Sequence, residues 1–431
     1  MAYHRFSMCI LLATACGPGM PEDSATDPGS SSTTEPAGST IGPPATTTGP
    51  TPETDTAVPT TTAPTTGEPV ICPEGQPWEL LGADRLAVPA DFVASARHRI
   101  LTTTVDGRVA IGGFQGAPAA PAVLLASPTG QVLAVNAGAP GPEVQPLGLS
   151  RDPAGELVLY GWRLEDGVNK PFFARFAGDG SPLSEVPLAL SVLGKPFALS
   201  KSGGLVAGLD EPGDQHVLAR FNPETGAVEW QQTLEELPLL VEEAIAVTSQ
   251  GGIVLATRTD IDDLGVSHRV DIDVFNPDGT VAWRTALDDL PHGAIEAVAV
   301  TPNDRIVVLR TGAEPNAALD LIALDLFHGL PVWFQTVAVA DETGAPHGRD
   351  LIVDADALTI PVLRPGADAV SLGSVEIQRV SFDGELLEMV PLPVPANPSP
   401  HFEALATRGS CGELVILAGE GQDLWLGSFA P

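Results

Sequence analysis

Short apolar runs recur at a nearly constant spacing along this chain, and they constrain its fold more than any other feature. Each run follows a turn residue, and the first four turn glycines, Gly107, Gly155, Gly203 and Gly251, are 48 residues apart. The seven runs are RVAIGG (108–113), ELVLYG (156–161), GLVAGL (204–209), GIVLAT (252–257), RIVVLR (305–310), LTIPVL (358–363) and ELVILAG (413–419). Apolar runs of this length between turn residues predict strands buried on both faces, and the spacing indicates one repeated structural unit.

Each unit has the same internal order of predicted strands. An alternating strand such as EAIAVTS (243–249) precedes the buried run, and a third strand such as HVLARF (216–221) follows it. A glycine-containing hairpin then leads to a last strand such as AVEW (227–230). Four antiparallel strands in about fifty residues are typical of a propeller blade. The sequence therefore predicts an all-β fold, a seven-bladed beta-propeller of four-stranded antiparallel blades.

The seventh unit lacks its last strand at the C-terminal end. It begins at FEALATR (402–408) and continues through DLWLGSFAP (423–431), which gives three strands. QPWELLG (76–82), just before the first unit, has the tryptophan and the alternation of a last strand. We expect the two ends of the domain to share one blade, because such closure removes two free sheet edges.

The N-terminal segment predicts export. A basic start, MAYHR, precedes the short apolar run FSMCILLATA, which is too short to span a bilayer as a helix. LATAC (12–16) resembles the lipobox of bacterial lipoproteins, which implies a signal peptide at 1–15 and a lipid on Cys16. Gly17 is not aspartate, so the sorting rule of that family implies the outer membrane, on its periplasmic or cell-surface side. The alternative is an ordinary secretory signal with an incidental cysteine.

Residues 16–71 differ in composition from the rest of the chain. They are rich in Thr, Pro, Ser and Gly, with seven acidic and no basic residues after Cys16. Such a segment has little apolar surface to bury and predicts a disordered linker, which leaves 72–431 as the propeller. Acidic residues outnumber basic ones 55 to 21 in the whole chain, so a nucleic acid would be repelled.

One hairpin phrase carries a resemblance to a known family. FNPETGAVEW (221–230) recurs as FNPDGTVAW (275–283), and Trp230, Trp283 and Trp333 hold matching places. The phrase resembles the repeat of quinoprotein-type propellers, which implies that each tryptophan docks between blades. The likeness extends to the outer-membrane propeller lipoprotein of the barrel-assembly machinery, although that family has eight blades. Vicinal cysteines beneath the quinone are absent here, so no cofactor is expected.

Two cysteines remain in the predicted exported domain once Cys9 leaves with the signal and Cys16 takes lipid. Cys72 precedes the expected closing strand, and Cys411 lies in the first turn of the last unit. A disulfide between Cys72 and Cys411 is expected in an oxidising compartment. The alternative for Cys411, within GSCG, is an exposed nucleophile.

Histidines and carboxylates recur in the loops that lead into the first strands of several units. Pro-His occurs in PHGAIEA (291–297), PHGRDL (346–351) and PHFEA (400–404), each time with a carboxylate nearby. The candidate ligand rim comprises His98, Glu243, His292, Glu296, His347, Asp350, His401 and Glu403. Side chains of these types around a channel mouth suit a divalent metal of unknown identity, a cationic ligand or protons. The alternative is structural, with each histidine tying its loop to its own blade.

The sequence contains no G-x-S-x-G, H-E-x-x-H, P-loop or G-x-G-x-x-G motif after a strand, and we assign no catalytic residue. We therefore expect a lipid-anchored, extracytoplasmic and monomeric propeller. Its expected role is a non-enzymatic binding or scaffolding module for an unidentified protein or cationic ligand. Two alternatives remain: a propeller enzyme, a lyase or hydrolase, that uses the rim, and an outer-membrane assembly factor supported by fold analogy.

Overall fold

The computed structural model describes residues 77–94, 100–188, 197–199, 205–211, 215–234, 240–260, 268–287, 293–312, 317–341, 344–348, 350–365, 372–392, 404–409, 411–420 and 423–431. The chain divides into two units, Met1–Ala63 and Pro64–Pro431, and every described residue belongs to the second. The predicted signal peptide, Cys16 and the linker boundaries lie outside these residues. Among the residues that are described, no helix is long and apolar enough to cross a membrane.

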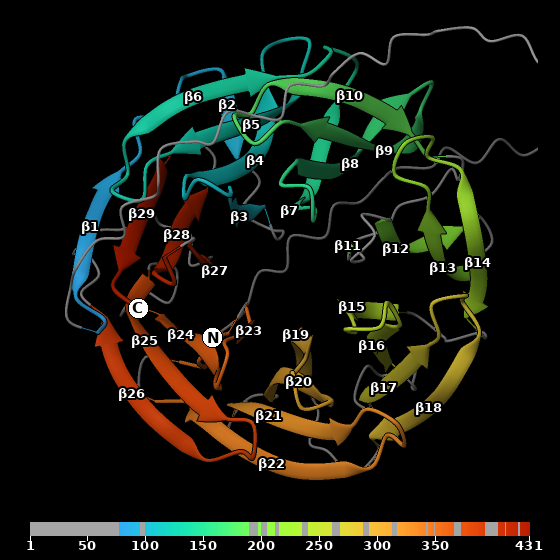
Figure 1. Ribbon diagram of the computed structural model, residues 1–431, viewed down its shortest axis with the longest axis vertical. Coiled ribbons are helices and arrows are strands. Elements are labelled where there is room, and N and C mark those ends of the chain that lie inside the picture. Colours follow the sequence, from blue (N-terminus) through green and yellow to red (C-terminus); the bar gives the residue numbers. More distant parts are fainter. Residues whose placement is uncertain are drawn as a thin grey trace, which may run out of the picture. The chain divides into compact units, whose positions relative to one another are not determined.

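The described chain is all β, and its strands form antiparallel sheets that follow one another around a ring (Figure 1). The first sheet along the chain has five strands: β2 (Phe92–Ala94), β3 (Leu101–Thr103), β4 (Val109–Gln115), β5 (Ala120–Ala126) and β6 (Val132–Ala137). The next two blades consist of β7 (Val144–Arg151), β8 (Leu157–Glu165), β9 (Val168–Phe176) and β10 (Pro182–Pro187), then β11 (Phe197–Leu199), β12 (Leu205–Glu211), β13 (Gln215–Phe221) and β14 (Val228–Leu234).

Four further blades complete the described ring, and each has four strands. Two of them are β15 (Leu240–Val247), β16 (Ile253–Asp260), β17 (His268–Phe275) and β18 (Val281–Leu287), then β19 (Gly293–Val300), β20 (Arg305–Gly312), β21 (Ala318–Asp325) and β22 (Pro331–Val339). The other two are β23 (Ile352–Val353), β24 (Ala357–Pro365), β25 (Leu372–Ser381) and β26 (Leu386–Leu392), then β27 (Ala404–Arg408), β28 (Leu414–Glu420), β29 (Asp423–Phe429) and β1 (Leu80–Arg85).

The prediction of seven four-stranded blades is wrong. Among the described residues six blades have four strands, and the remaining sheet has five, because two short strands, β2 and β3, share the innermost position beside β4. Phe92 pairs with Gln115 and Ala94 with Gly113, and the Phe92 ring lies where a side chain on Gly113 would have to be. The glycine thus admits β2 beside β4.

The burial of the strands explains why their sequences look as they do. All seven residues of β5 are buried, and the first five of β4 are buried, because both faces of a middle strand pack against neighbouring blades. The outer strands β18 and β26 instead alternate between exposed and partly buried residues, as expected where only one face is covered. The continuous apolar runs were therefore correctly predicted from the sequence. The alternation expected of the first strand EAIAVTS (243–249) is not observed, because the adjacent residues Ala244 and Ile245 are both buried.

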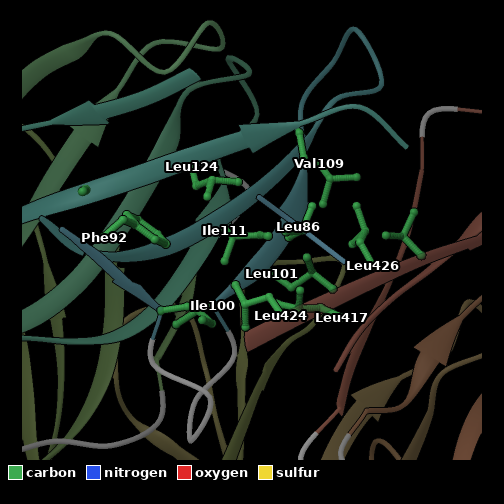
Figure 2. Packing of buried hydrophobic residues seen from close by; sticks show 14 residues of the cluster. Leu86, Phe92, Ile100, Leu101, Val109, Ile111, Leu124, Leu417, Leu424 and Leu426 are labelled. Carbon is green, nitrogen blue, oxygen red and sulfur yellow. The ribbon is translucent and has the colours of Figure 1, made fainter. Parts of the chain in front are cut away.

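The closing blade joins the two ends of the domain, as predicted. β1 pairs antiparallel with β29, with Ala83 opposite Gly427. The Trp78 N–H donates to the Ala430 carbonyl at 3.1 Å, and the Leu86 N–H donates to the Leu424 carbonyl at 2.9 Å. Figure 2 shows the core that this blade forms with the five-stranded sheet, in which Leu86, Leu424 and Leu426 lie near Leu101 and Val109.

Three tryptophans join neighbouring blades through one repeated contact. In each case the indole ring N–H donates to a backbone carbonyl in the hairpin before the outer strand of the next blade. The bonds run from Trp230 to Pro277 at 3.1 Å, from Trp283 to Leu326 at 2.8 Å and from Trp333 to Phe382 at 2.9 Å. Each ring covers a glycine with positive φ, Gly279, Gly329 or Gly384, on which a Cβ would lie 2.6, 2.6 or 2.8 Å from the ring. The docking between blades that the sequence resemblance implied is confirmed.

Cys411 lies in the turn between β27 and β28. Its predicted partner, Cys72, lies outside the described residues, so no disulfide links two described cysteines. The Cys411 N–H donates to Oε2 of the buried Glu413 at 2.9 Å, which fixes the turn. The specific pairing of Cys72 with Cys411 stays a prediction.

Candidate functional site

The structure describes only part of the candidate rim. His98, His292, His401 and Glu403 lie outside the described residues, and Glu243 is placed through its backbone alone, opposite Thr257 in the β15–β16 ladder. His347, Asp350 and Glu296 are described. Within the described ranges no group of three or more His, Cys, Asp or Glu side chains could hold a metal ion. A metal or cationic ligand at the rim stays a prediction.

The described rim residues take part in hydrogen bonds within and between blades. The backbone of His347 exchanges two hydrogen bonds with Leu363 of β24, at 2.9 and 2.7 Å, which fastens this loop to its own blade. Oδ2 of Asp350 accepts from the Ala406 N–H of the closing blade at 2.8 Å. Oε1 of Glu296 accepts from the Thr311 hydroxyl at 2.8 Å. These bonds are the kind that the structural alternative requires.

A cavity of about 350 Å³ lies against the innermost strands beside the closing blade. Its lining comes from four sheets and comprises Thr102, Thr103, Ser150, Arg151, Asp350, Leu351, Ile352, Val353, Ala406, Thr407 and Arg408. Hydroxyl groups and two guanidinium groups predominate among the polar atoms, and they donate hydrogen bonds to oxygen-rich ligands. The lining holds neither histidine nor cysteine, so these hydroxyls lack the general base that activates a nucleophile most often.

The cavity wall is held together by bonds across the blade boundaries. The Thr103 hydroxyl donates to the Arg408 carbonyl at 2.8 Å, and Arg151 Nη1 donates to the Thr103 carbonyl at 3.0 Å. Arg408 also donates from Nε and Nη2 to the two carboxylate oxygens of Asp354, at 2.8 and 2.6 Å. The Asp354 carboxylate therefore balances the Arg408 charge, and Arg408 is chiefly a structural residue of the closing blade.

The sequence analysis missed the two arginines of the cavity. A signal was present, because each arginine directly follows the last small polar residue of a first strand, in LGLSRDPAG (147–155) and ALATRGSCG (404–412). The sequence analysis placed Arg408 at the end of the strand FEALATR (402–408) and assigned no role to either arginine. Their approach to one cavity depends on the ring, which brings β7 and β27 to either side of the five-stranded sheet.

A second candidate surface lies on the outer strands of two neighbouring blades and on the hairpin that leads into one of them. Among the described residues, eight of the fourteen exposed large apolar side chains belong to the blades β19–β22 and β23–β26. We call this set the outer apolar face, and its residues are Phe327, Leu330, Val332, Phe334, Val339, Leu386, Leu387 and Met389. The equivalent outer strands β10 and β18 expose one such residue each, Leu183 and Val281. The face is therefore local rather than a general property of the outer strands.

The hairpin between β21 and β22 supports this face. Asp325 Oδ1 accepts from the N–H groups of Phe327 and His328, at 3.0 and 2.9 Å, and lies 2.8 Å from the His328 ring Nδ1. The hydrogen bond with the His328 side chain is the main cause that lowers the pKa of Asp325 below its ordinary value. Partial burial acts in the opposite direction, and the two backbone N–H groups add to the lowering.

The Asp325 hairpin predicts a pH-dependent contribution to stability. Since the folded-state pKa is lower than the unfolded one, ordinarily about 3.9, the contribution is present above that value and is lost as the pH falls through the folded-state pKa. Asp325→Asn should therefore lower the melting temperature near neutral pH, and the difference from wild type should shrink in acid. Thermal unfolding of both proteins between about pH 7 and about pH 2 measures this. A difference independent of pH would contradict it.

Comparisons with known proteins identify no family for this chain. No family model matches the chain, and no curated protein matches it. Among solved structures it is similar to BamB from Moraxella catarrhalis, with 10% identity over 82% of this chain and 100% of that chain and a TM-score of 0.41. It is also similar to the Pan2 WD40 domain of Neurospora crassa, with 12% identity, 83% and 97% coverage and a TM-score of 0.47.

Proposed function

We propose that this chain is a non-enzymatic binding module that docks a protein partner on the outer apolar face while a lipid on Cys16 holds it at the outer membrane. The concentration of exposed apolar side chains on two adjacent blades carries the proposal. Solvent-exposed patches of this kind are uncommon on monomeric proteins and mark interaction sites. The propeller supplies a rigid support, because Trp333 fastens β22 to the hairpin of the next blade.

An enzymatic role receives no comparable support from the described residues. A lyase or hydrolase would need a general acid or base that is free to exchange protons with substrate. Asp350 accepts a hydrogen bond from the Ala406 N–H, and Glu296 accepts one from the Thr311 hydroxyl. No histidine is among the residues that line the cavity beside its hydroxyl groups. We therefore retain the binding role.

Photo-crosslinking from the outer apolar face tests the binding role. A photoreactive residue replaces Met389, on β26, or Leu183, on β10, and both side chains are 51% exposed. Irradiated membranes should give a discrete crosslinked species from position 389 and none from position 183. Identical patterns from the two positions, or no species from position 389, would contradict the proposal.

The anchor has its own test. Cys16→Ser removes the only thiol in the lipobox-like segment, so the variant should leave the membrane fraction for the soluble one. Fractionation followed by immunoblotting measures the distribution, and Cys9→Ser serves as the matched control that should stay in the membrane. Tight membrane association of Cys16→Ser would exclude the lipid anchor and leave the outer apolar face unaffected.

A further inference from the structure

We propose that the free edge of β22 binds an extended, basic segment of the partner, which adds to the blade β19–β22 as a fifth strand. This inference rests on the proposed function and names the partner's chemistry at the same surface. Strand addition uses main-chain hydrogen bonds for affinity and alternate side chains for specificity. It requires an accessible edge, an apolar surface beside it and a complementary charge.

The edge of β22 lacks charged side chains, although the strand begins at Pro331 and its ladder with β21 has two register shifts. β22 stands last in its blade and pairs only with β21, so within the described structure its other edge has no partner strand. Protein edges are commonly blunted by charged residues, prolines or short length. β22 has nine residues, and none of them is charged. The outer strands β14 and β26, by contrast, carry Glu229 and Glu388.

A side chain identifies which residues of β22 face this edge. The Gln335 side-chain amide donates to the Thr336 carbonyl at 2.8 Å, outside the ladder with β21. Since N–H and C=O groups point to the same edge at every second residue of a regular strand, Phe334 presents its groups in the direction of Thr336. The register shift in the ladder with β21 falls at Val332, where this alternation is interrupted. Gln335 occupies an acceptor that an incoming strand would use, and a surface side chain is displaced at small cost.

The side chains beside the edge offer an apolar surface. Val332 is 42% exposed and Phe334 is 50% exposed, and they share one face of β22. The next blade, fastened through Trp333, carries Leu387 and Met389 on the equivalent face of β26. A bound strand would place every second side chain against this surface, so the partner segment should have apolar residues at alternate positions.

Charge selects a basic partner over a second copy of this chain. The formal net charge of the chain is -34. Asp383 and Glu385 are exposed in the hairpin that receives Trp333, and neither makes an ion pair with a described residue. Two acidic copies would repel each other here, whereas Lys or Arg at the remaining alternate positions of a partner strand would be attracted. The occupant is therefore a basic, apolar-alternating strand.

Peptide binding to the full-length protein tests the inference. The probe is a fluorescent nine-residue peptide of alternating lysine and valine, and anisotropy measures its binding. Phe334→Lys places a like charge on the exposed edge, so it should weaken binding at least tenfold. Leu183→Lys, at an equally exposed position on β10, should bind as the wild type does. The melting temperatures of both variants should match that of the wild type, because both sites are exposed.

Two further peptides separate strand addition from general attraction. A lysine–serine peptide has the same charge without apolar groups, and a lysine–valine peptide N-methylated at alternate residues cannot complete the ladder. Both should bind at least tenfold more weakly than the probe. If either control peptide bound as tightly as the probe, the inference would be overturned. Undiminished binding of the probe to the Phe334→Lys variant would also overturn it, and so would a wild-type dimer that the Phe334→Lys substitution dissociates. If position 389 crosslinks a partner while no probe binds, this inference fails and the proposed function stands.

Discussion

A variant that begins at Leu86 should lose cooperative folding, whereas one that begins at Pro77 should fold. The first lacks both β1, which pairs with β29, and the buried Trp78 that precedes β1. Emptying a buried tryptophan site alone costs about 3–5 kcal/mol, and the lost ladder leaves β29 as an open edge. Such a loss approaches the total stability of an ordinary domain, about 5–15 kcal/mol.

Both variants lack Cys72, so their comparison isolates the strand from any effect of the predicted disulfide. Circular dichroism during urea unfolding gives the free energy of unfolding, and size-exclusion chromatography detects association through the open edge. We expect a broad transition and oligomers for the variant that begins at Leu86. A sharp transition with equal midpoints in the two variants would show that β1 contributes little to the closing blade.

Asp320→Leu should lower the free energy of unfolding by about 3–5 kcal/mol, because it leaves the Arg310 charge buried without this carboxylate. Arg310 Nη2 donates to Asp320 Oδ2 at 3.1 Å, and the two side chains are 1% and 6% exposed. The Thr336 hydroxyl donates to the other carboxylate oxygen at 2.7 Å. The pair therefore connects β20, β21 and β22 inside one blade.

The double variant Arg310→Met/Asp320→Leu is the control for this pair. Replacing both charges by apolar side chains of similar size is often close to neutral, so most of the lost stability should return. Urea unfolding of the two single variants, the double variant and wild type completes the cycle. An Asp320→Leu variant within about 1 kcal/mol of wild type would mean that the pair contributes little.

Local patterns explain why much of the fold was predictable. β16 occupies Ile253–Asp260, close to the predicted run GIVLAT (252–257), because a strand buried on both faces must be apolar throughout. The hairpin before Trp283 contains Gly279 at a φ of 85°, a conformation that favours glycine, so the turn is visible in the sequence. The missing last strand of the closing blade was also correctly predicted, because the count of strands left one unpaired edge.

The candidate site was less predictable, because its partners are distant in sequence. RIVVLR (305–310) ends in an arginine that the sequence places at the end of a strand, yet Arg310 is buried against Asp320. The Asp350 carboxylate was predicted to face a ligand, and it accepts a hydrogen bond from Ala406 of the next blade. No local pattern distinguishes a carboxylate that binds a ligand from one that caps a neighbouring backbone.

The sequence by itself determined the repeated β unit, its turns, the docking tryptophans and the closure of the ring, since each depends on residues within about fifty positions or on a simple count of strands. The tertiary structure alone decided that one sheet has five strands, that Arg151 and Arg408 meet at one cavity, and that exposed apolar side chains gather beside the uncharged edge of β22. Thr103 and Arg408 are 305 positions apart and share a hydrogen bond. Contacts of that kind follow from the packing of blades around the ring, which no single repeat encodes.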